Sequence, residues 1–139
     1  MPPKTNAEKI VEFHKKIGSP LPNKPIVPTP YTIALRQKLV DEEYAEVTAA
    51  FQEIITAQKA GETPDISQLM HELADLLYVV YGAMWGFGVD PDPVFAEIHR
   101  ANLGKAGGPR RADGKLLKPP DWKPANVASV IKQMSHENA

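Results

Sequence analysis

The sequence predicts an all-α fold for a single domain of 139 residues, 1–139. Apolar residues recur at helical spacing through most of the chain, and no segment shows the alternation of apolar and polar residues that is typical of a strand. Clusters of glycine and proline separate the helical segments. The chain contains no cysteine, which excludes disulfides and thiolate metal sites.

The first helix is expected over residues 5–17. Thr5 and Glu8 have the spacing of a capping box, in which the hydroxyl and the carboxylate each accept a hydrogen bond from a free backbone N–H group. Gly18 is expected to end this helix. Residues 19–30 contain five prolines and no helical period, so an extended connection is expected there.

Two long helices are expected over residues 31–60 and 66–87, and Asp65 with Gln68 resembles a second capping box. From Leu73 onward the second long helix is apolar on almost every side. A helix of this kind has to be buried on every side. Two explanations remain open: a central core helix within one chain, or a helix that a partner subunit covers.

The remaining segments are a helix over residues 92–104, a basic loop over 105–123 and a last helix over 124–135. Asp90 and Asp92 each precede a proline, and either aspartate can cap the first of these helices. Glycine, proline and lysine are frequent in the loop, which shows no helical or strand period.

Charge is segregated along the chain. The net charge is −1, so no overall field attracts the protein to nucleic acid or to a membrane surface. Residues 41–75 nevertheless carry nine acidic and one basic side chain, whereas residues 100–123 carry seven basic and two acidic ones. This asymmetry indicates a cationic segment that folds over an anionic site, or two segments that flank a metal-bound phosphate. Neither a signal peptide nor an apolar run of membrane-spanning length is evident, so a cytoplasmic location is expected.

Each long helix carries two carboxylates three residues apart, Glu43 with Glu46 and Glu72 with Asp75. Residues at this spacing share one helix face, and both pairs lie on or beside an apolar stripe that faces the core. Carboxylates are rarely buried unless they are paired or bound to a metal. Because all-oxygen ligation suits Mg²⁺ or Mn²⁺, these four are candidate metal ligands. The alternative is that they belong to solvated outer faces of amphipathic helices.

Two neighbours of these pairs have open roles. Glu42 could orient or deprotonate a metal-bound water, or it could be an exposed helix residue. His71 is interpreted as a packing residue or as an outer hydrogen-bond partner of the site. The pattern lacks the Glu-x-x-His pairs of di-iron helical bundles, so hydrolysis is favoured over redox chemistry.

The basic segment supplies candidate contacts to the phosphates of a nucleotide. The alternative is a solvated, mobile loop. These candidates are Asn102, Lys105, Arg110, Arg111, Lys115 and Lys118.

As a set, these motifs resemble the MazG-like, all-α nucleoside triphosphate pyrophosphohydrolase superfamily over about residues 5–135. The runs 71–78 and 94–103, with Asp113-Gly114-Lys115 and Trp122 after them, look closest to a bacterial MazG-like branch with dUTPase activity. The resemblance implies a four-helix-bundle-like fold in a homodimer or dimer of dimers, with sites built from more than one chain.

The resemblance also implies a reaction. Family members cleave between the α- and β-phosphates, giving a nucleoside monophosphate and pyrophosphate, with Mg²⁺ as cofactor and Mn²⁺ as a substitute. Carried over to this chain, the four paired carboxylates become the metal ligands and Glu42 the carboxylate that activates water or binds further metal. Asn102 and Lys105 become contacts to phosphate or sugar.

The expected substrate is dUTP, in a role that keeps misplaced nucleotides out of DNA. Alternatives are dCTP, a damaged nucleotide or phosphoribosyl-ATP, and from another class a non-catalytic helical dimer that binds a nucleotide or a protein. Asn6, Phe13, His14 and Trp122 have the chemistry to recognise a base, although core packing or capping is the alternative for each.

Overall fold

The structure, a computed structural model that describes residues 2–137, confirms the predicted all-α class. The described residues contain no strand, and one isolated antiparallel bridge joins Arg110 to Leu116. No helix in this part of the chain is long and apolar enough to cross a membrane. In chain order, the helices are α1 (Asn6–Lys16), α2 (Pro30–Lys59), α3 (Ser67–Gly86), α4 (Pro91–Leu103) and α5 (Val127–Glu137).

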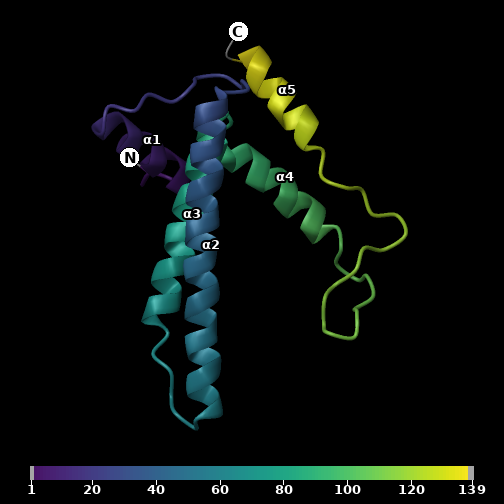
Figure 1. Cartoon of the computed structure of the whole chain (residues 1–139). Coiled ribbons are helices and arrows are strands. Elements are labelled where there is room, and N and C mark those ends of the chain that lie inside the picture. Colours follow the sequence, from purple (N-terminus) through teal and green to yellow (C-terminus); the bar gives the residue numbers. More distant parts are fainter. Residues whose placement is uncertain (1, 138–139) are drawn as a thin grey trace.

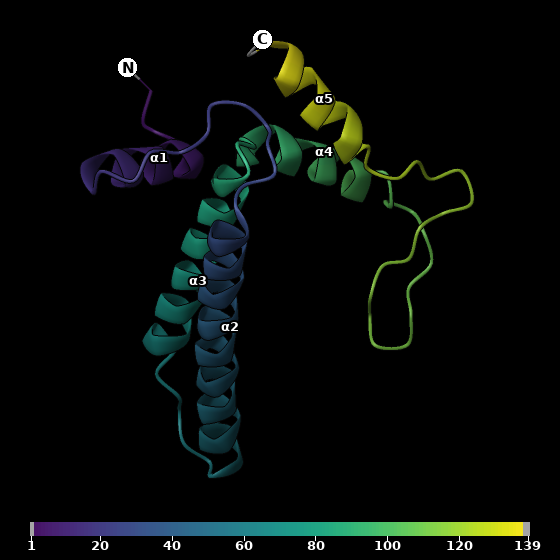
Figure 2. The ribbon, with the colours of Figure 1, turned by 45° about the horizontal axis from the view of Figure 1, so that its top comes forward.

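The antiparallel pair α2 and α3 forms the centre of the structure (Figure 1). α1 packs against α3, whereas α4 and α5 extend from the end of α3 toward the opposite side (Figure 2). A small apolar cluster of Val47, Ala50 and Leu69 lies between the two central helices. One chain therefore supplies a helical hairpin whose outer surfaces its other helices cover only in part.

The predicted complete burial of α3 is not met within one chain. Leu77 and Tyr78 remain 44% and 42% exposed, although they lie in the most apolar part of the sequence. α1 covers a neighbouring part of this helix without enclosing it (Figure 2). Of the two explanations for this apolar helix, a core helix enclosed by its own chain is therefore excluded.

Local hydrogen bonds explain the helix starts that were predicted correctly. The Thr5 hydroxyl accepts a hydrogen bond from the Glu8 backbone at 3.2 Å, and the Thr5 backbone donates to the Glu8 carboxylate at 2.9 Å. The predicted capping box is thereby confirmed. Of the two candidate caps of α4, Asp90 is the one used, since its carboxylate accepts from the Asp92 backbone at 3.0 Å.

One predicted helix cap and one predicted helix start were wrong. Asp65 accepts a hydrogen bond from the Ser67 backbone, but the Gln68 side chain donates to Glu72 on the next turn, so the second capping box does not form. The last helix begins at Val127 rather than at residue 124. Asn126 caps this helix, because its side-chain oxygen accepts a hydrogen bond from the Ser129 backbone at 3.0 Å. The Asn126 backbone N–H donates to the Glu97 carboxylate of α4 at 2.7 Å.

Arg36 joins three helices at a notch formed by two glycines of α3. A Cβ atom at Gly82 would lie 3.2 Å from Arg36 Nη1, and one at Gly86 would lie 3.1 Å from Arg36 Nε. The guanidinium also reaches α1, where its Nη2 donates to His14 Nε2 at 3.2 Å. His14 Nδ1 donates to the Ile10 carbonyl at 2.9 Å, which leaves Nε2 as the acceptor that Arg36 requires.

Gly86→Ala is expected to lower the free energy of unfolding by about 1 kcal/mol, since overpacking against the clamped Arg36 outweighs the better helix propensity of alanine. In an Arg36→Ala background the same change should raise the free energy of unfolding by up to about 1 kcal/mol, because the obstacle is gone. Urea denaturation of the four proteins measures both effects. If Gly86→Ala stabilised the protein in the wild-type background, the close packing of Arg36 against this glycine would be contradicted.

Candidate active site

The pairing of α2 with α3 brings the predicted carboxylates together. Glu43 is half-buried on the face of α2 that contacts α3, opposite a buried Glu72 and a half-buried Asp75. Desolvation is the largest cause that raises the pKa of Glu43 above its usual value. The charges of Asp75 and Glu72 raise the pKa further, followed by those of Glu46 and Glu42 on its own helix. The charges of the other predicted ligands thus act on Glu43, whereas the ligand atoms that lie within 4.8 Å of one another are those of His71, Glu72 and Asp75.

This carboxylate cluster fits a divalent cation. Glu46 and Glu42 are exposed and lie at its rim, while Glu43 and Glu72 are its more enclosed members. In the part of the chain that the structure describes, no lysine or arginine forms an ion pair with any of these carboxylates. Several hard oxygen donors without a cationic partner are the ligand set that divalent ions of the Mg²⁺ and Mn²⁺ type prefer.

Two polar side chains of α3 each contact one oxygen of a neighbouring carboxylate on the same helix. Gln68 Nε2 donates to Glu72 Oε1 at 2.5 Å, and His71 Nε2 lies 3.0 Å from Asp75 Oδ2. His71 is exposed, which contradicts the packing interpretation and agrees with that of an outer hydrogen-bond partner. The hydrogen bond from Gln68 to Glu72 was not predicted from the sequence, because the position of Gln68 also suited a helix cap. The four-residue spacing between the two residues was the signal that could have indicated it.

Three of the four candidate base contacts lie on or next to α1. Phe13 is 42% exposed, and its ring meets those of His14 and Tyr78 edge to face at 5.4 and 5.6 Å between centroids. His14 is buried with both ring nitrogens engaged, so it offers a wall rather than a free hydrogen-bonding group. Asn6 is exposed and lines a small recess beside Tyr78 and Tyr81.

Arg36 is a residue of this region that sequence reasoning missed. It lies seven residues before Glu43, which places both on one face of α2 about 10 Å apart along the helix axis. Burial lowers the pKa of its guanidinium, and its buried Nε has no hydrogen-bond partner among the described residues. A lone arginine on the apolar stripe of α2 was the signal that could have identified it.

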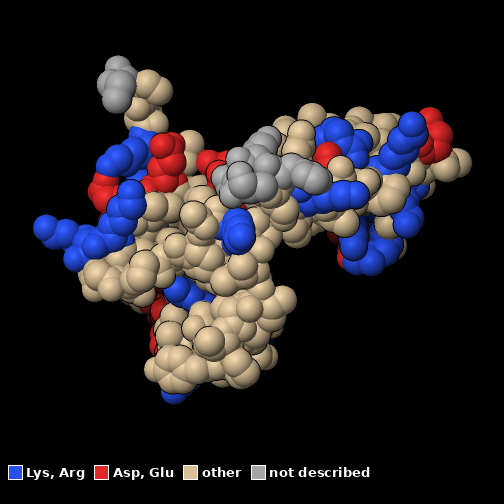
Figure 3. All heavy atoms as spheres, turned by 90° about the horizontal axis from the view of Figure 1, so that it is seen from above, with Lys and Arg blue, Asp and Glu red and all other residues tan. Residues whose placement is uncertain are grey.

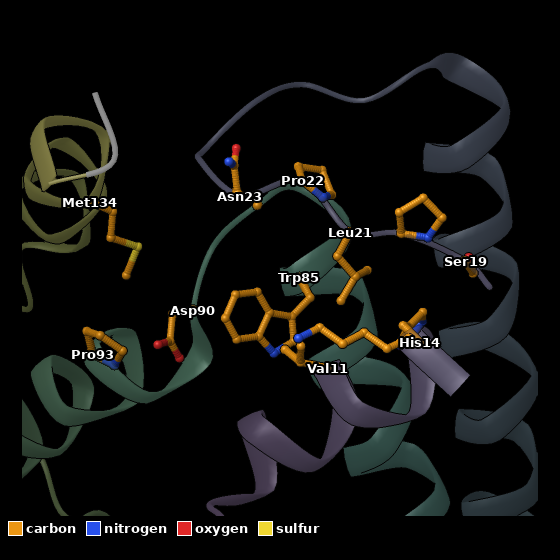
Figure 4. A pocket seen from close by; sticks show the side chains of 13 residues that line it. Val11, His14, Ser19, Leu21, Pro22, Asn23, Trp85, Asp90, Pro93 and Met134 are labelled. Carbon is orange, nitrogen blue, oxygen red and sulfur yellow. The ribbon is translucent and has the colours of Figure 1, made fainter. Parts of the chain in front are cut away.

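A cavity of about 550 Å³ lies between α1, the connection to α2 and the end of α3 (Figure 4). Its walls combine apolar residues such as Trp85 with polar ones such as Asn23 and Asp90. Trp85 follows Asp75 by ten residues on α3, or about 15 Å along the helix. This cavity is therefore separate from the carboxylate cluster.

The basic residues gather on another part of the molecule. The Nζ atoms of Lys105 and Lys118 lie 5.5 and 5.4 Å from the centroid of the Trp122 ring. Trp122 Nε1 donates a hydrogen bond to the Ala101 carbonyl at 2.6 Å. Trp122 is thus part of the α4 and loop region and does not lie with the candidates on α1 (Figure 1). Asn102 is exposed near the end of α4.

Local contacts also shape the tip of the basic loop. Arg110 Nη1 donates to the Gly114 carbonyl at 2.9 Å, and Arg111 forms an ion pair with Asp113 that also receives the Lys115 backbone N–H. Lysine and arginine side chains are prominent over this part of the surface (Figure 3). In both ribbon views the loop lies apart from α2 and α3, so one chain does not fold its cationic segment over its own carboxylates (Figures 1 and 2).

Together, the helical fold and the carboxylate cluster define an all-α protein with an acidic site suited to a divalent cation. The phosphoribosyl-ATP pyrophosphohydrolase family matches residues 10–102, which include both central helices and the whole carboxylate cluster. The chain belongs to this family, an all-α member of the MazG-like superfamily, and membership implies an enzyme that hydrolyses a pyrophosphate bond of a nucleotide. A comparison with curated proteins found no match. The matched range ends before the basic loop and α5.

Removing the charge of Glu43 is expected to stabilise the metal-free protein near neutral pH. The folded state raises the pKa of Glu43, so the unfolded chain loses this proton first and stability falls as pH rises above the usual value of 4.5. Glu43→Gln stays uncharged, so in chelator its Tm should exceed that of the wild type at about pH 7 and approach it below about pH 4.5. Thermal unfolding followed by circular dichroism across this range measures the difference.

Glu53→Gln is the matched control, because Glu53 is an exposed carboxylate of the same helix. An equal shift in both variants would attribute the effect to the general charge of α2 rather than to the cluster.

Proposed function

We propose that this protein hydrolyses a nucleoside triphosphate or related nucleotide between its α- and β-phosphates, with release of pyrophosphate. The ligands of the required divalent cation are Glu43, Glu46, Glu72 and Asp75. The observation that carries this proposal is the grouping of acidic side chains at the contact of the two central helices. Ligand atoms of His71, Glu72 and Asp75 lie within 4.8 Å of one another, and the charges of Asp75 and Glu72 help to raise the pKa of Glu43 on the facing helix. A divalent cation bound there would offset these negative charges and would also bind the phosphates of a nucleotide.

The residues around the cluster have different proposed roles in the reaction. A bound Mg²⁺ or Mn²⁺ neutralises charge on the phosphates and favours ionisation of water. Glu42 is exposed beside Glu43 and would accept the proton of the water that attacks the α–β linkage. The water oxygen bonds to one phosphorus of the α–β linkage while the bond from that phosphorus to the bridging oxygen breaks, so that a nucleoside monophosphate and pyrophosphate are released. Gln68 and His71 orient the Glu72 and Asp75 carboxylates by holding one oxygen of each.

Two candidate substrates are supported by different observations. dUTP is the first candidate, because the likeness to MazG-like dUTPases continues over Asp113-Gly114-Lys115 and Trp122, beyond the matched range. The second is phosphoribosyl-ATP, after which the matching family is described. For either substrate, Phe13 and Asn6 on α1 are the candidate base contacts, with His14 as a wall behind them. Removal of dUTP would make the enzyme one that protects the nucleotide pool.

A second copy of the chain is the proposed partner. The chain exposes 10082 Å², whereas a folded monomer of 15.3 kDa exposes about 7,100 Å². Tyr31, Tyr44 and Phe51 are among the large apolar side chains exposed along α2, at 79%, 65% and 46%. The excess is about 3,000 Å² per chain, or about 6,000 Å² for two chains, which lies at the upper end of the total area that obligate interfaces bury. In such a dimer the basic loop of one subunit, with Lys105 and Lys115, would bind phosphates held at the carboxylates of the other.

The proposed reaction is tested by pyrophosphate release from dUTP, dCTP, other nucleoside triphosphates and phosphoribosyl-ATP, with Mg²⁺, with Mn²⁺ and with chelator. Turnover of dUTP to dUMP and pyrophosphate that stops with chelator is expected. Glu72→Gln should lower turnover by about a hundredfold or more, since it removes a charged ligand from the most enclosed part of the cluster. Metal-dependent turnover of phosphoribosyl-ATP alone would keep the reaction and replace the substrate.

Absence of turnover with every nucleotide, in a folded and metal-loaded sample, would contradict the proposed reaction. It would favour a helical dimer that binds a nucleotide or a protein without catalysis.

Sites shared between subunits are tested by mixing two inactive variants, Glu72→Gln and Lys105→Ala. In a mixed dimer one site carries both changes and the other carries neither, so refolding an equal mixture should restore about one quarter of wild-type activity. Glu72→Gln mixed with Glu43→Gln is the control, because both changes affect the carboxylates of a single chain. Recovery in neither mixture would contradict a loop that acts on the partner's site.

A further inference from the structure

His71 places an imidazole nitrogen at the edge of the carboxylate cluster. Its Nε2 lies 3.0 Å from Asp75 Oδ2, and ligand atoms of His71, Glu72 and Asp75 all lie within 4.8 Å of one another. Neighbouring ligands of an octahedral ion, each about 2.1 Å from the metal, are about 3.0 Å apart. The separation of His71 and Asp75 therefore suits a hydrogen bond and equally suits two ligands of one ion.

The surroundings leave the imidazole free to adjust. The side chains of His71 and Asp75 are 68% and 46% exposed, so no packing fixes either of them. Glu72 is more constrained, because it is buried and Gln68 holds its Oε1, which leaves Oε2 for a ligand role. Opposite ligands of an octahedral ion are about 4.2 Å apart, so the three atoms reach ligating distances through a small movement of the exposed pair.

Metal ions differ in whether they use such a nitrogen. Mg²⁺ prefers oxygen ligands and retains several waters, whereas transition ions such as Mn²⁺ and Co²⁺ accept imidazole, with affinity that rises from Mn²⁺ to Co²⁺. We propose that His71 discriminates between these ions at the cluster, an inference that rests on the proposed function. With Mg²⁺ the imidazole stays a hydrogen-bond partner of Asp75, and with Mn²⁺ or Co²⁺ it becomes a further ligand.

Metal affinity in the full chain tests this role. Isothermal titration with Mg²⁺, Mn²⁺ and Co²⁺ compares the wild type with His71→Gln, whose amide can still donate to Asp75 but is a poor nitrogen ligand. Affinity for Co²⁺ and Mn²⁺ is expected to fall about tenfold or more, with the larger loss for Co²⁺, while affinity for Mg²⁺ changes less than about twofold. His99→Gln is the matched control, because His99 is an exposed histidine of α4.

A spectroscopic measurement separates ligation from positioning. Electron spin echo measurements of the Mn²⁺-loaded protein should show coupling to an imidazole nitrogen in the wild type and in His99→Gln, and none in His71→Gln. Coupling that persists in His71→Gln, or an equal loss of affinity for Mg²⁺ and Mn²⁺, would overturn the proposal and leave His71 as a positioning residue.

Failure of the proposed function has a different signature. If the wild type bound no divalent ion, or if Glu72→Gln bound all three ions as the wild type does, the carboxylate cluster would not be the metal site and both proposals would fall. If Mg²⁺-dependent pyrophosphate release were normal and His71→Gln bound every ion as the wild type does, only the role of His71 would be rejected.

Discussion

Repulsion among carboxylates across the α2–α3 contact is the interaction that constrains the rest of this structure. Glu43 faces α3 beside the apolar cluster, because Val47 and Ala50 follow it on the same side of α2. Hydrophobic contacts thus hold acidic groups closer than their charges favour. The conflict is local, and the proposed cation would resolve it, so the same pairing that builds the core also positions the candidate site.

Charge changes sign along this contact. Toward α1, two turns before Glu43, Arg36 passes through the glycine notch and engages His14 rather than a carboxylate. A guanidinium placed there without a charged partner is costly, yet it couples α1 to the central helices at a defined point. Because α1 carries Phe13 and Asn6, the Arg36 contact also sets where the candidate base contacts lie relative to the carboxylates.

Features that depend on neighbouring residues in the chain were predictable from sequence. The Thr5 capping box and the common helix face of Glu43 and Glu46 follow from helical spacing, which hardly depends on tertiary structure. Features that depend on a choice between partners were not. Gln68 could cap the helix or bind Glu72, and Asn126, which caps α5, is also held by a carboxylate of α4 that lies 29 residues away along the chain. Sequence spacing cannot rank such competing partners, because their energies differ by little more than the strength of one hydrogen bond.

The position of the basic loop is the main argument for the proposed site that two subunits share. Its shape is defined before any substrate arrives, since Lys105 and Lys118 lie over Trp122 and Arg111 is paired with Asp113. This ordered loop lies apart from α2 and α3, which carry the carboxylates of its own chain (Figure 1). In a two-fold assembly every contact occurs twice, so a chain with one acidic and one basic region satisfies both by facing its copy. The same logic explains how a net charge of only −1 coexists with strong segregation of charge.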